Sequence, residues 1–164
     1  MPFTDALLPE FDREMGTTRK LLERVPEPHL AWKPHERSMS LARLATHIAE
    51  IPQWGERILC QDEIDLTGPY QPREEPSRTA ILALFDSATA QIRKTLAAKS
   101  DGELMAPWTF KREGKVMFTA PKVAMLRSMV LNHMVHHRGQ LSVYLRLHDV
   151  PLPAIYGPSA DEGR

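Results

Sequence analysis

Residues 121–148 read PKVAMLRSMVLNHMVHHRGQLSVYLRLH and predict one long amphipathic helix. Pro121 suits the first turn of a helix, where the missing backbone N–H would have no intrahelical partner. The prediction ends near His148 because Pro151 cannot continue the helix. The apolar residues that recur at helical spacing are Leu126, Val130, Met134, Leu141 and Leu145.

Three earlier stretches, separated by clusters of prolines, show the same periodicity and predict helices near residues 4–25, 40–59 and 77–98. Ser40 or Ser38 can cap the second of these helices, and Ser77 can cap the third. Four helices joined by proline-containing connections indicate an all-α fold. Their apolar stripes comprise Leu8, Phe11, Met15, Leu22 and Val25, then Leu41, Leu44, Ile48, Ile51 and Ile58, then Ile81, Leu84, Phe85, Ala88, Ile92 and Leu96.

The connection from about Gln61 to Pro76 is long for a simple turn between antiparallel helices. Its extended reach is about 50 Å at ~3.3 Å per residue, whereas a 20-residue helix is ~30 Å long. We therefore expect a crossover that makes the second and third helices parallel, as in some four-helix bundles. An up-down-up-down bundle with a flexible loop is the alternative. Trp108 to Thr119 contains two short apolar strands around Gly114 and predicts a small hairpin before the last helix.

Length and composition indicate one domain spanning residues 1–164, with a proline-rich tail from about residue 149. The 21 basic and 21 acidic residues cancel, so the broad basic excess of a nucleic-acid-binding protein is absent. The longest apolar run is Ala80 to Phe85, too short for a membrane span. No signal peptide is visible and Cys60 is the single cysteine, so we expect a cytoplasmic protein.

Three histidines form a candidate metal site. His133 and His137 are four residues apart, so on a helix they lie one turn apart on the same side. His136 is an alternative to His137 but points further round the helix. His47 lies beside the apolar stripe of the second predicted helix, so it also leans inward. Neutral imidazoles bind zinc and nickel, and three protein ligands leave a coordination position open for water or substrate.

Several other kinds of site do not fit the sequence. There is no His-Glu-x-x-His zinc-protease motif, no Glu-x-x-His motif of a di-iron bundle and no phosphate-binding Gly-rich loop. Cys60 has no neighbouring sequence feature that indicates an activated thiolate, so an ordinary free cysteine is the preferred interpretation.

The predicted helices, the segment Leu44-Ala45-Thr46-His47-Ile48-Ala49-Glu50 and the segment from His133 to Gln140 together resemble the DinB/YfiT-like family. The likeness covers nearly the whole chain, and His-His-Arg-Gly-Gln is its most specific part. The resemblance implies a four-helix bundle, often dimeric, with one divalent metal ion per chain bound by His47, His133 and His137. Zinc or nickel is the preferred ion, with iron or manganese as alternatives.

Some relatives in that family are thiol-dependent transferases or isomerases that use low-molecular-weight bacterial thiols. The resemblance therefore suggests a metal-dependent enzyme that activates a small thiol for transfer to an electrophile. Metal-dependent hydrolysis by bound water and a non-catalytic metal-binding or stress-related role are the alternatives. Gln140, Tyr144 and Arg138 are the candidate substrate-binding residues. A surface or interface ion pair is the preferred alternative for Arg138, and polar contacts within the core are the preferred alternative for the other two. We expect a homodimer and no nucleic-acid or membrane partner.

Overall fold

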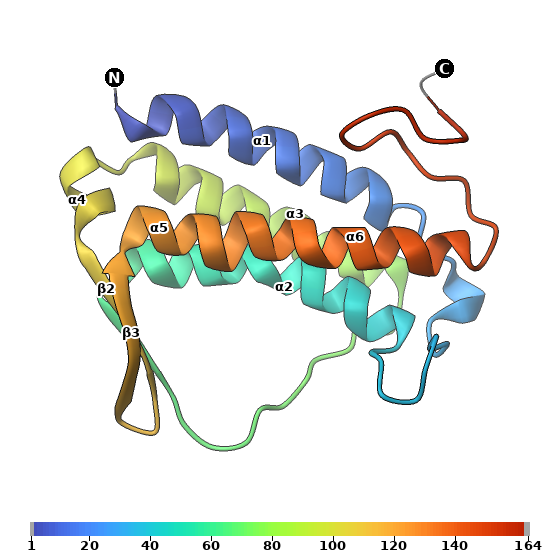
Figure 1. Ribbon diagram of the computed structural model, residues 1–164, viewed down its shortest axis with the longest axis horizontal. Helices are drawn as coiled ribbons and strands as arrows, with labels where there is room; N and C mark the ends of the chain where they lie inside the picture. Colours follow the sequence, from blue (N-terminus) through green and yellow to red (C-terminus); the bar gives the residue numbers. More distant parts are fainter. Residues whose placement is uncertain (1, 163–164) are drawn as a thin grey trace.

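The computed structural model describes residues 2–162, which are mostly helical with one small sheet. In Figure 1, α5 (Lys122–Leu126), η2 (Arg127–Asn132) and α6 (His133–Arg146) follow one another without a break and together form the fourth long helix. The elements are α1 (Phe3–Leu22), η1 (Glu27–His29), α2 (Leu41–Cys60), β1 (Glu63–Leu66), α3 (Arg78–Ala97), α4 (Asp101–Met105), β2 (Pro107–Arg112), β3 (Lys115–Pro121), α5 (Lys122–Leu126), η2 (Arg127–Asn132) and α6 (His133–Arg146).

Local capping interactions fix where the helices begin. The Ser40 hydroxyl accepts a hydrogen bond from the backbone N–H of Arg43, and the Ser77 hydroxyl accepts one from Ala80. Both caps were predicted. Ser100 and Glu103 form a reciprocal capping box that starts α4, a short helix absent from the prediction.

The ends of two helices differ from the prediction. α1 ends at Leu22 rather than Val25, because Pro26 follows and has no N–H to continue the helical bonding; Val25 is nevertheless fully buried. The last helix was predicted as regular over residues 121–148. It instead contains the π-helical segment η2, in which the wider i→i+5 turn interrupts the α-helical ladder, and it ends at Arg146.

The long helices bury their apolar stripes against one another. α1 packs against α3 and α6, and α2 packs against α3 and α6. Ile48, Ile81, Ile92 and Leu141 have no exposed surface, and burial of each such side chain contributes ~1.5–3 kcal/mol before entropic costs. These helices define the core on which the site is built.

Gly55 allows α2 and α3 to approach closely. A Cβ atom at this position would lie 1.8 Å from Ile92 Cδ1 and 3.3 Å from Val130 Cγ2. Any side chain at residue 55 would therefore have to displace packed core atoms. The glycine places α2, which carries His47, tightly against its neighbours.

The connection between α2 and α3 returns along the molecule to the end where α2 begins, so the two helices run in the same direction (Figure 1). On its way this connection forms β1, which pairs in parallel with β2, while β2 and β3 form an antiparallel hairpin. β1 was not predicted, because four residues inside a long connection carry little periodic signal. The turn of the hairpin contains Glu113 and Gly114 at φ 51° and 76°, the backbone conformation of a tight hairpin turn.

Among the helices of residues 2–162, none combines the length and the apolar character needed to cross a membrane.

Candidate metal centre

The π-helical segment η2 positions the first histidine of the candidate site. His133 is the first residue of α6 and follows η2 directly. Its ring donates a hydrogen bond to the backbone carbonyl of Met129, inside the π-helical turn. A π-helical turn widens the helix locally and often occurs at functional sites. The turn therefore supplies the carbonyl that orients the His133 ring.

His47, His133 and His137 bring their ring nitrogens together between α2 and α6. His133 Nε2 lies 3.2 Å from His47 Nε2 and 2.9 Å from His137 Nε2. One ligand atom from each ring lies within 4.8 Å of the others. His137 is buried and the other two are half-buried. These separations suit ligands that each lie ~2.0–2.1 Å from one zinc ion.

The hydrogen bonds behind two of the rings leave their inner nitrogens unprotonated. His137 Nδ1 donates to Gln140 Oε1 at 2.7 Å. Because His133 Nε2 faces the other rings, its bond to the Met129 carbonyl comes from Nδ1. In the neutral rings, the lone pairs on Nε2 of His133 and His137 therefore face each other across 2.9 Å. A cation between them would turn this repulsion into attraction, so the residues present fit a bound metal ion.

The pKa values of the three histidines favour the neutral form that binds metals. Burial, followed by the nearby charged forms of His137, His133 and Arg43, lowers the pKa of His47 to about 3. Burial also lowers the pKa values of His133 and His137, against the opposing effects of their bonds to Met129 and Gln140. At neutral pH all three rings are therefore uncharged and available as ligands.

The lowered pKa of His47 predicts how the stability of the metal-free protein depends on pH. Between the unfolded value of about 6.5 and the folded value of about 3, only the unfolded chain takes up a proton at this residue. The free energy of unfolding should therefore fall as the pH falls through this range. From pH 7 to pH 5, His47 should account for about 2 kcal/mol of the loss.

Urea denaturation at pH 7 and pH 5, with EDTA present, measures this loss. The His47→Gln variant should lose less stability between the two pH values than the wild type does, because it lacks the titrating group. Equal losses in the two proteins would contradict the assignment of the pH effect to His47.

An arginine on α2 connects the histidines to the crossover connection. Arg43 donates from Nη1 to Glu50 Oε2 at 2.9 Å and to the backbone carbonyl of Arg73 at 2.8 Å. Its Nη2 donates to the Tyr70 hydroxyl and lies 3.4 Å from His47 Nδ1. Since Arg73 and Tyr70 belong to the connection, Arg43 ties that segment to the helix beside His47.

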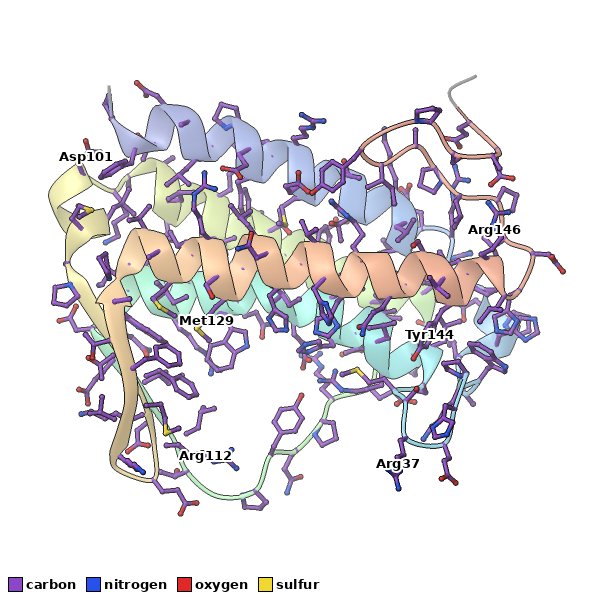
Figure 2. The ribbon with its side chains drawn as sticks, viewed as in Figure 1. Arg37, Asp101, Arg112, Met129, Tyr144 and Arg146 are labelled. Atoms are coloured by element: carbon purple, nitrogen blue, oxygen red, sulfur yellow. The ribbon has the colours of Figure 1, made fainter. Side chains whose placement is uncertain are left out.

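A pocket of about 410 Å³ opens next to His47 and His133. α2 forms its floor, the crossover connection and the hairpin form its sides, and Met129 reaches it from η2 (Figure 2). The residues that line it are His47, Glu50, Gln53, Trp54, Arg57, Leu66, Tyr70, Phe110, Met129 and His133. A molecule entering this pocket would therefore meet His47 and His133 directly.

The three candidate substrate-binding residues lie outside this pocket lining. Gln140 is exposed and supports His137 through its side-chain oxygen. Tyr144 lies further along α6 from Met129 (Figure 2), where its hydroxyl donates to the Met39 carbonyl at 3.2 Å. Arg138 is 1% exposed and forms an ion pair with Glu14 on α1. Arg138 therefore forms an ion pair, but the pair is buried inside the chain and not at the surface or an interface as expected from the sequence.

Most of the pocket wall was missed in the sequence, although one signal was present. His47, Glu50, Trp54 and Arg57 follow one another at positions i, i+3, i+7 and i+10, which places them on one side of α2. Leu66, Tyr70 and Phe110 come from distant segments, so only the folded chain reveals them.

Two alternative residues do not join the cluster. His136 is exposed, and the group of three histidines that meets metal-binding distances excludes it. Cys60 is also exposed, and its thiol donates to Glu56 Oε1 at 3.3 Å. Partial burial and this hydrogen bond raise the pKa of the thiol, which is opposite to the shift of an activated cysteine.

Two proteins of known sequence are similar to this chain over most of its length. The proteins YjoA and YrdA of Bacillus subtilis (strain 168) are 26% identical over 147 residues and 25% identical over 162 residues. The matches cover 87% of this chain and 89% of YjoA, and 96% of this chain and 90% of YrdA.

Two crystal structures share the fold. The DinB-like protein YjoA of B. subtilis matches with a TM-score of 0.71 and 22% identity, over 90% of this chain and 95% of that chain. A DinB-like protein of Bacillus cereus ATCC 10987 matches with a TM-score of 0.72 and 19% identity, over 94% and 98%. The DinB family model matches residues 1–164. The chain therefore belongs to the DinB family, as the His-His-Arg-Gly-Gln segment had suggested.

Proposed function

We propose that His47, His133 and His137 bind one divalent metal ion, zinc or nickel by preference, and that the protein is a metal-dependent enzyme that transfers a small thiol to an organic electrophile. The observation that carries the proposal is the convergence of three imidazole nitrogens at the edge of a pocket. Three protein ligands leave a coordination position free for a substrate.

A divalent ion at this position lowers the pKa of a thiol that coordinates it, so that the thiolate is available at neutral pH. The residues of the chain orient the ligands and provide a surface for the electrophile. Gln140 and the Met129 carbonyl keep the His137 and His133 rings oriented with Nε2 toward the centre. Trp54 and Phe110 provide apolar surface on which an electrophile can be held near the sulfur.

The ion pair between Glu50 and Arg43 favours thiol transfer over hydrolysis as the reaction. A hydrolase that uses bound water benefits from a carboxylate free to accept a proton. Glu50 is the only carboxylate among the described residues that line the pocket, and it is bonded to Arg43 at 2.9 Å. A thiol would itself be the nucleophile, and a bound divalent ion would favour its thiolate form, so thiol transfer would not require such a base.

The test uses nickel- or zinc-loaded protein with L-cysteine as the thiol and 1-chloro-2,4-dinitrobenzene as the electrophile. We expect formation of the thioether with release of chloride, lost in His133→Ala and retained in His136→Ala. We also expect the thiol to change the absorption spectrum of the nickel-loaded protein. Hydrolysis of p-nitrophenyl acetate that needs the three histidines but no thiol would instead identify a hydrolase.

If neither reaction occurs and thiols leave the nickel spectrum unchanged, the transferase proposal is wrong and a binding role replaces it. The expected homodimer stays a prediction.

A further inference from the structure

The floor of the pocket has a polar end at the histidines and a basic end at Arg57. Both ends lie on the same side of α2, because the residues between them follow helical spacing. Ten residues separate His47 from Arg57, which corresponds to ~15 Å along the helix axis. The pocket is therefore elongated enough for a ligand with two chemically different ends.

Arg57 is exposed and supplies the positive charge at its end of the pocket. Among residues 2–162 no carboxylate lies within ion-pair distance of its guanidinium, which instead lies 5.4 Å from the centre of the Trp54 ring. Glu50 is the carboxylate among the described residues of the pocket lining, and it forms an ion pair with Arg43 at 2.9 Å. The Arg57 end of the pocket thus favours an anion.

The walls between the two ends are apolar. Trp54, Leu66, Phe110 and Met129 contribute most of this surface. The Phe110 ring is held by stacking on Phe118, with ring centres 5.1 Å apart and an angle of 11° between the rings. Two aromatic rings and two flexible aliphatic side chains suit a hydrocarbon or aromatic body rather than a sugar or a peptide backbone.

From this arrangement we infer that the pocket binds an organic monocarboxylate with an apolar or aromatic body. The carboxylate pairs with Arg57, whose planar guanidinium can donate two parallel hydrogen bonds. The body lies against Trp54 and Phe110, and the opposite end points toward His47 and His133. Only this last element rests on the proposed function, since it makes the ligand the electrophilic partner of the thiol.

Binding of 4-phenylbutyrate and of its uncharged amide, 4-phenylbutanamide, tests the inference without metal or catalysis. Isothermal titration calorimetry on EDTA-treated protein should show the carboxylate binding about 3-fold more tightly than the amide, as expected for an ion pair with an exposed arginine. Arg57→Gln should abolish this preference and leave the affinity for the amide unchanged. Arg57→Lys should keep part of it. Arg13→Gln, which changes an exposed arginine on α1, should match the wild type.

Equal affinities for the two compounds in the wild type, or an unchanged preference in Arg57→Gln, would overturn the inference. A zinc titration of the same preparations separates it from the proposed function. If zinc fails to bind but the Arg57-dependent preference persists, the metal proposal is wrong and the carboxylate site stands. If zinc binds and the preference is absent, the metal proposal stands and the carboxylate site is wrong.

Discussion

A His133→Ala variant is expected to bind zinc at least ~100-fold more weakly than the wild type, more than the ~10–100-fold that loss of a group supporting a ligand typically costs. His133 occupies the centre of the cluster, because its Nε2 faces Nε2 of both His47 and His137. Its removal leaves two imidazoles from different helices and a gap between them. Competition titration against a chromophoric chelator measures the change in affinity.

His136→Ala is the matched control, since it removes an exposed imidazole from the same helix without touching the cluster. It should bind zinc with the affinity and the one-to-one stoichiometry of the wild type. If His133→Ala keeps the wild-type affinity, or if His136→Ala loses as much affinity as His133→Ala, the three histidines are not the metal ligands.

Sequence periodicity was sufficient for the long helices because each carries an apolar stripe bounded by prolines or serine caps. It was also sufficient for grouping His133 with His137, whose four-residue spacing fixes their relative position on a helix. Adding His47 needed the family resemblance, since periodicity does not say which helices touch. The structure then brings the three rings together.

The features that periodicity missed depend on tertiary packing or on backbone detail. The π-helical turn at Arg127–Asn132 changes the hydrogen bonding by one residue and leaves the apolar pattern nearly unchanged. β1 has only four residues, and its pairing partner lies more than 40 positions away. The burial of Arg138 could not be predicted from the sequence either. Its partner Glu14 belongs to the first helix, and only folding brings the two residues together.

A Glu14→Ala variant is expected to lose about 3–5 kcal/mol of unfolding free energy, the usual cost of leaving one charge of a buried pair without its partner. Arg138 is 1% exposed and Glu14 is 8% exposed. Arg138 Nη2 donates to Glu14 Oε2 at 2.6 Å, and the Tyr156 hydroxyl donates to the same oxygen at 3.0 Å. Without the carboxylate, the guanidinium keeps only two acceptors among residues 2–162, Thr18 Oγ1 and the Glu14 backbone carbonyl.

The double variant Glu14→Leu/Arg138→Met distinguishes the cost of an unpaired charge from the cost of altered packing. It removes both charges and fills their volume with apolar atoms, so it should recover most of the stability that Glu14→Ala loses. Urea denaturation at pH 7 compares the three proteins. A loss below ~1 kcal/mol in Glu14→Ala would indicate the weak coupling of a solvent-exposed pair. A double variant as unstable as Glu14→Ala would instead show that this position depends on the geometry of the ion pair. Removal of the unpaired charge would then have recovered none of the lost unfolding free energy.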